Sequence, residues 1–119
     1  MDELPKLSHE KLDVYQKAIL FLAMAAKIVA CIPRGNGELI DQLRRAALSV
    51  PLNIAEASGR TGSLDNARHF AIARGSALES GAVLDAAFAL GLIDQALYRD
   101  GKILIVPIVA MLSKLCMKK

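Results

Sequence analysis

The sequence predicts an all-α protein that folds as an up-down-up-down antiparallel four-helix bundle. Four segments carry apolar residues at alternating spacings of three and four, the period of an amphipathic helix. Short segments rich in Gly, Pro, Asn and Asp separate them. The chain is 54% hydrophobic but only 4% aromatic, so Ala, Leu, Ile and Val must build the core. Its 119 residues suffice for one core, and we expect a single domain over residues 1–119.

The first helix is expected over residues 8–32, after an extended arm at residues 1–7. Ser8 is a candidate N-cap, and Glu10 places a negative charge in the first turn, where the helix dipole favours it. Two apolar stripes follow helical spacing: Leu12, Tyr15, Ile19, Leu22, Ala26 and Val29 in the first, and Val14, Ala18, Phe21, Ala25, Ile28 and Ile32 in the second. One apolar stripe is enough to pack a helix into an antiparallel bundle, so the second stripe is additional apolar surface.

The second helix, expected over residues 38–58, is Arg-rich and contains Pro51, which predicts a kink. On a helical wheel, a buriable seam gathers Leu43, Ala46, Ala47, Val50, Ile54 and Ala57. A separate polar stripe gathers Gln42, Arg45, Ser49, Asn53, Glu56 and Arg60. Leu48 and Leu52 lie away from the seam, which indicates a helix that is packed on more than one side.

The third helix is expected over residues 63–90, with Ser63 as N-cap and Gly91 as C-terminal cap. Its seam consists of Phe70, Ala73, Ala77, Leu84 and Phe88, with Gly81 allowing close approach. The fourth helix is expected over residues 94–117, with Asp94 as N-cap and basic residues including Lys118 and Lys119 at its C-terminal end. Residues 103–106 resemble a strand, but helical spacing continues on both sides of Pro107 and favours a kinked helix. Its two stripes are Leu97, Leu104, Ile108, Met111 and Leu115, and Ile105, Val109, Leu112 and Cys116.

The double stripes of the first and fourth helices exceed what one bundle core can bury, so we expect a homo-oligomer. The acidic N-terminus has no apolar run behind it, which argues against a signal peptide. The longest apolar stretch, residues 18–32, contains Lys27 and is shorter than the roughly 20 residues of a membrane span. We expect a cytoplasmic protein with no membrane partner.

Little in the sequence points to catalysis. His9 and His69 lack nearby groups for metal binding or nucleophile activation, and we expect both to be solvated. Cys31 and Cys116 form no metal-type pair and are expected to be reduced core residues. The serines lack a Gly-x-Ser-x-Gly elbow, and residues 59–63 lack the Gly-Lys-Ser/Thr ending of a phosphate loop. We therefore expect no enzyme, no catalytic residue, no cofactor and no metal.

The second helix carries a specific motif: Gln42-Leu43-Arg44-Arg45-Ala46-Ala47, Ser49-Val50-Pro51, Asn53-Ile54-Ala55-Glu56 and Gly59-Arg60. A second block contains Phe70, Ile72-Ala73-Arg74-Gly75-Ser76 and Glu79, followed by Gly91-Leu92-Ile93. Together they resemble the four-helix-bundle proteins encoded in intervening sequences of bacterial 23S ribosomal RNA genes. The resemblance implies a pentameric, ring-like homo-oligomer without an established biochemical activity. A related family, the accessory variability proteins of diversity-generating retroelements, forms rings that engage a reverse transcriptase and nucleic acid.

The polar stripe has two interpretations. Its arginines have the planar donor fork that binds phosphate, but embedded acids would repel a polyanion and are natural partners for buried arginines. We favour a structural polar network, made of Arg45, Ser49, Asn53, Glu56, Arg74 and Glu79. Glu56→Ala is then expected to destabilise the fold or the ring, because stranding a buried charge typically costs about 3–5 kcal/mol.

Arg44, Arg60 and Arg68 are better candidates for binding nucleic acid. A formal net charge of +3 is modest, but repetition around a ring would concentrate it into a basic girdle. No aromatic residues are interleaved with these arginines, so contacts to the phosphate backbone would dominate. We expect a non-catalytic binding or scaffold protein that associates with RNA or DNA, preferentially structured RNA or a ribonucleoprotein. The alternative is a module that docks a partner protein, such as a reverse transcriptase, without touching nucleic acid.

Overall fold

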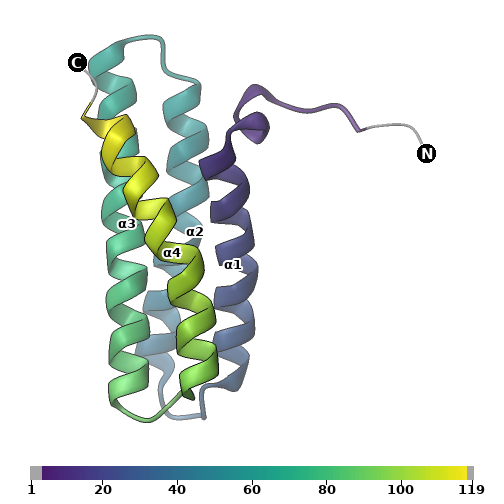
Figure 1. The fold of residues 1–119 in the computed structure, drawn as a ribbon, viewed down its shortest axis with the longest axis vertical. Coiled ribbons are helices and arrows are strands. Elements are labelled where there is room, and N and C mark those ends of the chain that lie inside the picture. The colour runs from purple at the N-terminus through teal and green to yellow at the C-terminus, as the bar shows by residue number, and fades with distance from the viewer. Residues whose placement is uncertain (1–3, 118–119) are drawn as a thin grey trace.

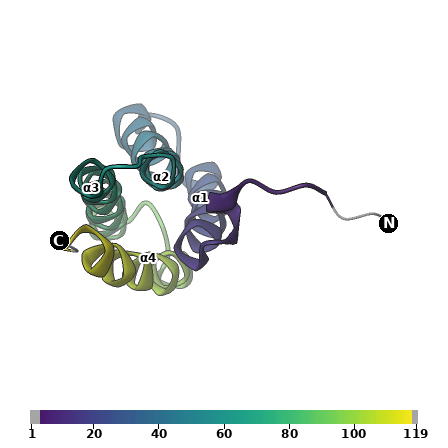
Figure 2. The same cartoon turned by 90° about the horizontal axis from the view of Figure 1, so that it is seen from above.

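The computed structural model describes residues 4–117, and the regular secondary structure within them is entirely helical (Figure 1). The four long helices are α1 (Asp13–Cys31), α2 (Gly37–Ser58), α3 (Ser63–Ala89) and α4 (Gln95–Cys116). They lie side by side around a common core and alternate in direction, as expected for an up-down-up-down bundle (Figure 2). Lys118, Lys119 and the first three residues of the expected arm lie outside the described part of the chain.

The first helix starts later than the sequence predicts. A short 3-10 helix, η1, occupies Ser8–Lys11, and Leu12 is extended, with φ −74° and ψ 130°, before α1 begins at Asp13. Ser8 is therefore inside η1 instead of capping a long helix, and Leu7 precedes it. The Glu10 carboxylate accepts a hydrogen bond from the Leu7 amide, so this acid stabilises the turn and not the start of α1.

The ends of α3 and α4 show one cap that the sequence misplaces and two that it predicts. Ser63 makes no capping hydrogen bond, and Gly62 occupies the N-cap position of α3. At the other end, Gly91 has a φ of +72°, its amide bonds to the Phe88 carbonyl, and the Leu92 amide bonds to the Ala87 carbonyl. This pair of bonds is a Schellman motif. Asp94 then caps α4 by accepting from the Leu97 amide at 2.9 Å.

The core takes one expected stripe from α2, mainly one from α1, and residues of both stripes from α4. On α2, all six residues of the expected seam are buried, from Leu43 to Ala57. On α1, the stripe from Val14 to Ile32 is buried together with Val29 of the other stripe, whose Leu12, Ile19 and Ala26 are exposed. On α4, Ile108 of one expected stripe and Ile105 and Leu112 of the other are all buried. Both proline-containing helices run without interruption through Pro51 and Pro107, so residues 103–106 are helical and not a strand.

The α3 seam differs from the expectation at its C-terminal end. Phe88 is 41% exposed, and its ring stacks on that of Tyr98 with centroids 4.5 Å apart. Ala87 is fully buried in its place. A Cβ atom added to Gly81 would have no heavy atom within 4 Å, so the close helix approach expected at this glycine is not formed among the described residues.

Close helix packing occurs instead at Gly101 of α4. A Cβ atom added to Gly101 would lie 2.7 Å from Leu84 Cδ1 and 3.2 Å from Ile28 Cδ1. Both neighbours are fully buried core side chains, so neither has free space to move into. The absence of a side chain at this position therefore sets how closely α4 approaches α1 and α3.

The bundle leaves much apolar surface outside its core. By length and composition, α1 is the one helix in residues 4–117 apolar enough to cross a membrane, yet only 33% of its most apolar window is buried in the bundle. Cys31, expected in the core, is exposed at the end of α1, and Cys116 is half-buried; both are free thiols. Cys31 lies one turn beyond the buried Ile28, on the outward side of the helix.

We predict that Gly101→Ala destabilises the protein by about 1–2 kcal/mol, because overpacking outweighs the gain of about 1 kcal/mol in helix propensity. Gly75→Ala is the matched control, since nothing lies within 4 Å of its added Cβ, and it should stabilise by about 0.5–1 kcal/mol. Urea unfolding of both variants measures the two effects. A Gly101→Ala variant at least as stable as wild type would contradict the close packing of α4.

Candidate interaction surfaces

A cluster of polar side chains joins α2 to α3. The Ser76 hydroxyl donates to the Ser49 hydroxyl at 2.7 Å, across the two helices. The Asn53 amide donates to the Ser49 hydroxyl at 3.0 Å and to the Ser49 carbonyl at 2.9 Å. On α3, the buried Ser80 hydroxyl donates to the Ser76 carbonyl at 2.9 Å. The Ser76–Ser49 bond crosses from α3 to α2 and favours one register of the two helices, because a shift of either helix would break it. The other bonds lie within one helix and hold the side chains in place for this contact.

His69 belongs to this cluster, which corrects the expectation of a solvated histidine. Its side chain is only 8% exposed, and Nδ1 lies 3.5 Å from Asn53 Oδ1. Nε2 is buried and has no hydrogen-bond partner among the described atoms. The ring is adjacent to the buried Phe70 in sequence and turns toward α2, a direction that no local motif specifies.

The expected structural network of six residues is divided between different contacts. Ser49 and Asn53 are bonded to each other, whereas the Arg74 Nε atom donates to the Ser113 hydroxyl on α4 at 2.7 Å. Glu56 pairs with Arg60 at 3.0 Å, and both side chains are about half exposed. Arg45 and Glu79 are exposed and make no hydrogen bond or ion pair with any described residue. The large cost of stranding a buried charge therefore does not apply to Glu56.

The three arginines considered for nucleic acid do not form one patch. Arg60 pairs with Glu56 and also with Asp65, the latter at 3.5 Å, and Arg68 pairs with the same Asp65 at 3.5 Å. Arg44 is exposed on α2, sixteen residues before Arg60, which is roughly 24 Å along a helix. Arg60 and Arg68 thus share a charge-balanced cluster at the α2–α3 turn, and Arg44 stands apart.

A third cluster links α3 to α4 and was not anticipated from the sequence. Asp85 accepts hydrogen bonds from the Tyr98 hydroxyl at 2.7 Å and from Lys102 at 3.1 Å. The Lys102 ammonium also lies 5.5 Å from the centroid of the Tyr98 ring. The hydrogen bond from Tyr98 is the main cause that holds the pKa of Asp85 below its ordinary value. Partial burial raises this pKa, and the hydrogen bond and positive charge of Lys102 lower it further. Reciprocally, the bond to Asp85 raises the pKa of Tyr98 and of Lys102.

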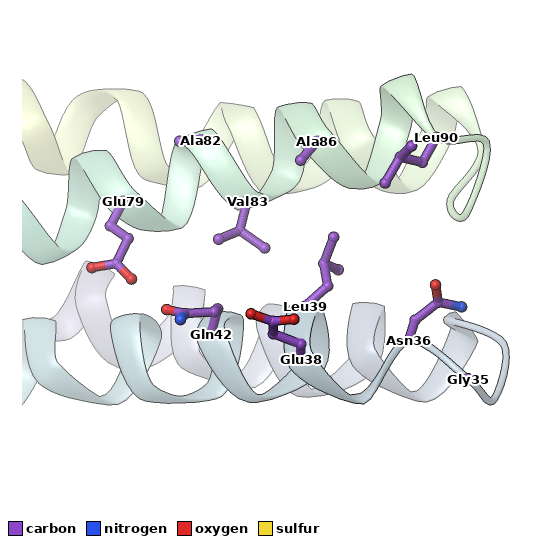
Figure 3. A pocket seen from close by; sticks show the side chains of 10 residues that line it. All are labelled: Gly35, Asn36, Glu38, Leu39, Gln42, Glu79, Ala82, Val83, Ala86 and Leu90. Atoms are coloured by element: carbon purple, nitrogen blue, oxygen red, sulfur yellow. The ribbon is translucent and has the colours of Figure 1, made fainter.

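A groove runs between α2 and α3 near the α1–α2 turn (Figure 3). Leu39 of α2 and Val83, Ala86 and Leu90 of α3 give it an apolar lining. Glu38 lies on its α2 side, and Glu79 reaches from α3 toward α2. Neither carboxylate has a hydrogen bond or ion pair with a residue in the range 4–117. The groove therefore combines an apolar lining with two uncompensated negative charges.

Chemical groups for catalysis are not assembled on these surfaces. Among the described residues, no three His, Cys, Asp or Glu side chains lie close enough to hold a metal ion. The His9 ring packs edge-on against Tyr15, with centroids 4.7 Å apart. The hydroxyls of Ser49, Ser76 and Ser113 take part in hydrogen bonds between helices, and none of these bonds joins a serine to a histidine or a carboxylate that could act as a general base.

We predict that Asn53→Ala costs about 1–2 kcal/mol of stability, because it leaves the buried His69 without a partner and removes one of the two hydrogen bonds to the Ser49 hydroxyl. Glu56→Ala, one turn away on the same helix, should cost less than about 0.5 kcal/mol, since it removes an exposed i,i+4 pair. Parallel urea unfolding of the two variants distinguishes them. Equal costs would contradict the assignment of register to the buried cluster.

We also predict a pH-dependent effect of Asp85→Asn. Because the folded-state pKa of Asp85 is lowered, its contribution is fully present above the unfolded value of about 3.9 and disappears as pH falls through the folded value. Wild type should exceed the variant by less than about 1 kcal/mol near neutral pH, since the carboxylate is largely exposed. Asp100→Asn, on the exposed side of α4, is the control. A difference that grows on acidification would contradict the Asp85 contacts.

The fold is shared with a solved protein of very different sequence. A crystal structure from Bacteroides thetaiotaomicron, described as a protein of unknown function from the S23 ribosomal protein family, superposes with a TM-score of 0.80. The two sequences are 20% identical, and the alignment covers 88% of this chain and 99% of the other. This similarity shows that the chains have the same fold. No curated protein matches the sequence.

The family resemblance seen in the α2 motif is confirmed over nearly the whole chain. The α2 seam and the α2–α3 cluster lie inside the segment that the family describes. The model of the 23S rRNA-intervening sequence protein family matches residues 10–114, and the chain belongs to that family.

Proposed function

We propose that this protein is a non-catalytic scaffold that assembles with copies of itself. The observation that carries this proposal is the set of large apolar side chains exposed on all four helices. Pairs of them stand on each helix: Ile19 and Leu20, Leu48 and Leu52, Ile72 and Leu78, and Ile103 and Val106. Large apolar side chains exposed on every helix are more than the single bundle covers, which favours interfaces with other copies. Burial between copies would remove it from water without any change in the bundle.

The form of the assembly follows from the resemblance and from the arrangement of these faces. Apolar residues stand on every side of the bundle and not on one self-complementary patch, which favours contacts between different faces of neighbouring copies. Such head-to-tail contacts close into rings when the rotation between copies permits. The pentameric ring implied by the family resemblance is the form that we expect.

Nucleic acid is the second candidate partner, and the distribution of basic groups favours it. Lys11 of η1 and Lys114 in the last turn of α4 have no ion-pair partner among the described residues, and both elements lie at the end of the bundle that holds the α2–α3 turn (Figure 1). Arg60 and Arg68 stand at the same end. Their pairing with acids weakens the attraction of one copy for phosphate, but an assembly would present this basic end several times. Association would then be driven by the phosphate backbone and be weakly selective for sequence.

We predict that the purified protein is an oligomer by light scattering and binds structured RNA and duplex DNA with an affinity that falls steeply across about 50–300 mM salt. Arg60→Ala with Arg68→Ala should weaken binding and leave the particle mass unchanged. Arg34→Ala with Arg99→Ala removes the same charge from the opposite end of the bundle and should leave binding near wild type.

The outcomes separate the two parts of the proposal. An intact oligomer that binds neither nucleic acid at the lowest salt excludes the second candidate and leaves the scaffold to dock a protein, such as a reverse transcriptase. Loss of binding in both double variants alike would show that net charge, and not the basic end, attracts the polyanion. A monomer at every concentration would overturn the scaffold itself.

A further inference from the structure

The groove between α2 and α3 is built to receive a basic apolar partner. Along α3, its lining extends from Glu79 to Leu90, roughly 16 Å at the rise of a helix. The middle of the groove is apolar, and Glu38 and Glu79 place unpaired carboxylates beside it (Figure 3). A surface that fills this groove needs apolar side chains to cover Leu39 and Val83, flanked by cations that reach the two acids.

The outer face of α2 carries that pattern. Arg44, Leu48 and Leu52 follow each other at intervals of four residues, so they stand on one side of the helix, with Arg45 beside them. Leu48 is 47% exposed and Leu52 is 59% exposed. Neither arginine makes a hydrogen bond or an ion pair with a described residue, although Asp41 precedes them by one turn. This ridge, Arg44 to Leu52, is roughly 12 Å long, which is within the length of the groove.

We propose that the ridge of one copy docks in the groove of the next, with Leu48 and Leu52 covering the apolar lining and Arg44 and Arg45 pairing with Glu38 and Glu79. The inference rests on the self-assembly proposed above and assigns its interface. Arg44 then serves assembly and not nucleic-acid binding, which agrees with its distance from Arg60 and Arg68.

A second copy is the occupant because the chain itself supplies the complementary surface. The ridge carries two positive charges and the groove two negative ones, and none of the four is paired with an opposite charge within the described part of the single chain. Groove-to-groove or ridge-to-ridge contacts would place like charges opposite each other, so each ridge must meet a groove. A head-to-tail contact does this and leaves the second ridge and groove of each pair open for further copies. Repetition of such a contact produces the closed ring expected for this chain.

Charge reversal tests the interface directly. The ridge variant carries Arg44→Glu and Arg45→Glu, and the groove variant carries Glu38→Arg and Glu79→Arg. All four sites are exposed, so both variants should keep the wild-type helix content by circular dichroism. Each variant alone should dissociate at a concentration at least about tenfold higher than wild type, measured by sedimentation.

Complementation gives the decisive result. In an equimolar mixture of the two variants, contacts between unlike copies again join a basic surface to an acidic one, so association should recover. A ring of five alternating copies keeps one contact between like copies, so the mixture should recover less fully than a chain with all four substitutions. A single chain with all four substitutions should also assemble, since its ridge and groove are both reversed. Arg99→Glu with Lys114→Glu matches the ridge variant in charge and should assemble as wild type.

Three outcomes would overturn the inference. If wild type assembles and the two reversed variants assemble equally well, the contact lies elsewhere and the scaffold proposal survives. If both variants dissociate but neither the mixture nor the fourfold variant reassembles, the two surfaces do not meet. If wild type is monomeric and its groove instead binds a basic amphipathic peptide, the occupant is a foreign helix and the self-assembling scaffold fails with it.

Discussion

The constraint on which the rest of the structure depends is the limited volume between four closely packed helices. Alanine and glycine line much of that volume, and Gly101 lies so near Leu84 and Ile28 that a methyl group would not fit without rearrangement. A core this narrow accepts only part of the apolar surface of each helix. The helices are apolar on more than one face, and large side chains such as Leu48, Leu52 and Ile103 are exposed. The remaining apolar surface stays outside, and self-assembly is the physical way to remove it from water.

The polar side chains between α2 and α3 fix the register of these helices, which the apolar core does not. Apolar contacts between alanines are tolerant of small displacements, whereas the Ser76–Ser49 and His69–Asn53 contacts form in one relative position of α2 and α3. The register of those two helices matters most because they form both walls of the groove. The same helix, α2, thus contributes a buried seam, a polar contact to α3 and an exposed ridge.

Much of this architecture could be predicted from local sequence, and the exceptions have a common cause. The α2 seam is fully buried as expected, because its period is unambiguous, and Asp94 and Gly91 act as caps through bonds to their own neighbours. Helix α1 offers two stripes of equal quality, and only packing against the other helices selects the one that is buried. His69 and the Asp85–Tyr98–Lys102 cluster depend on contacts between residues far apart in the chain. No periodicity or cap signal encodes such pairs.

The central claim is that apolar surface outside the core is covered by other copies, so that folding and assembly are coupled. The most direct test is the thermal unfolding of wild type over a range of about a hundredfold in protein concentration. Coupling predicts that Tm rises steadily with concentration, because association of the folded state stabilises it by mass action. A Tm that is the same at every concentration, for a protein that unfolds reversibly, would contradict the account.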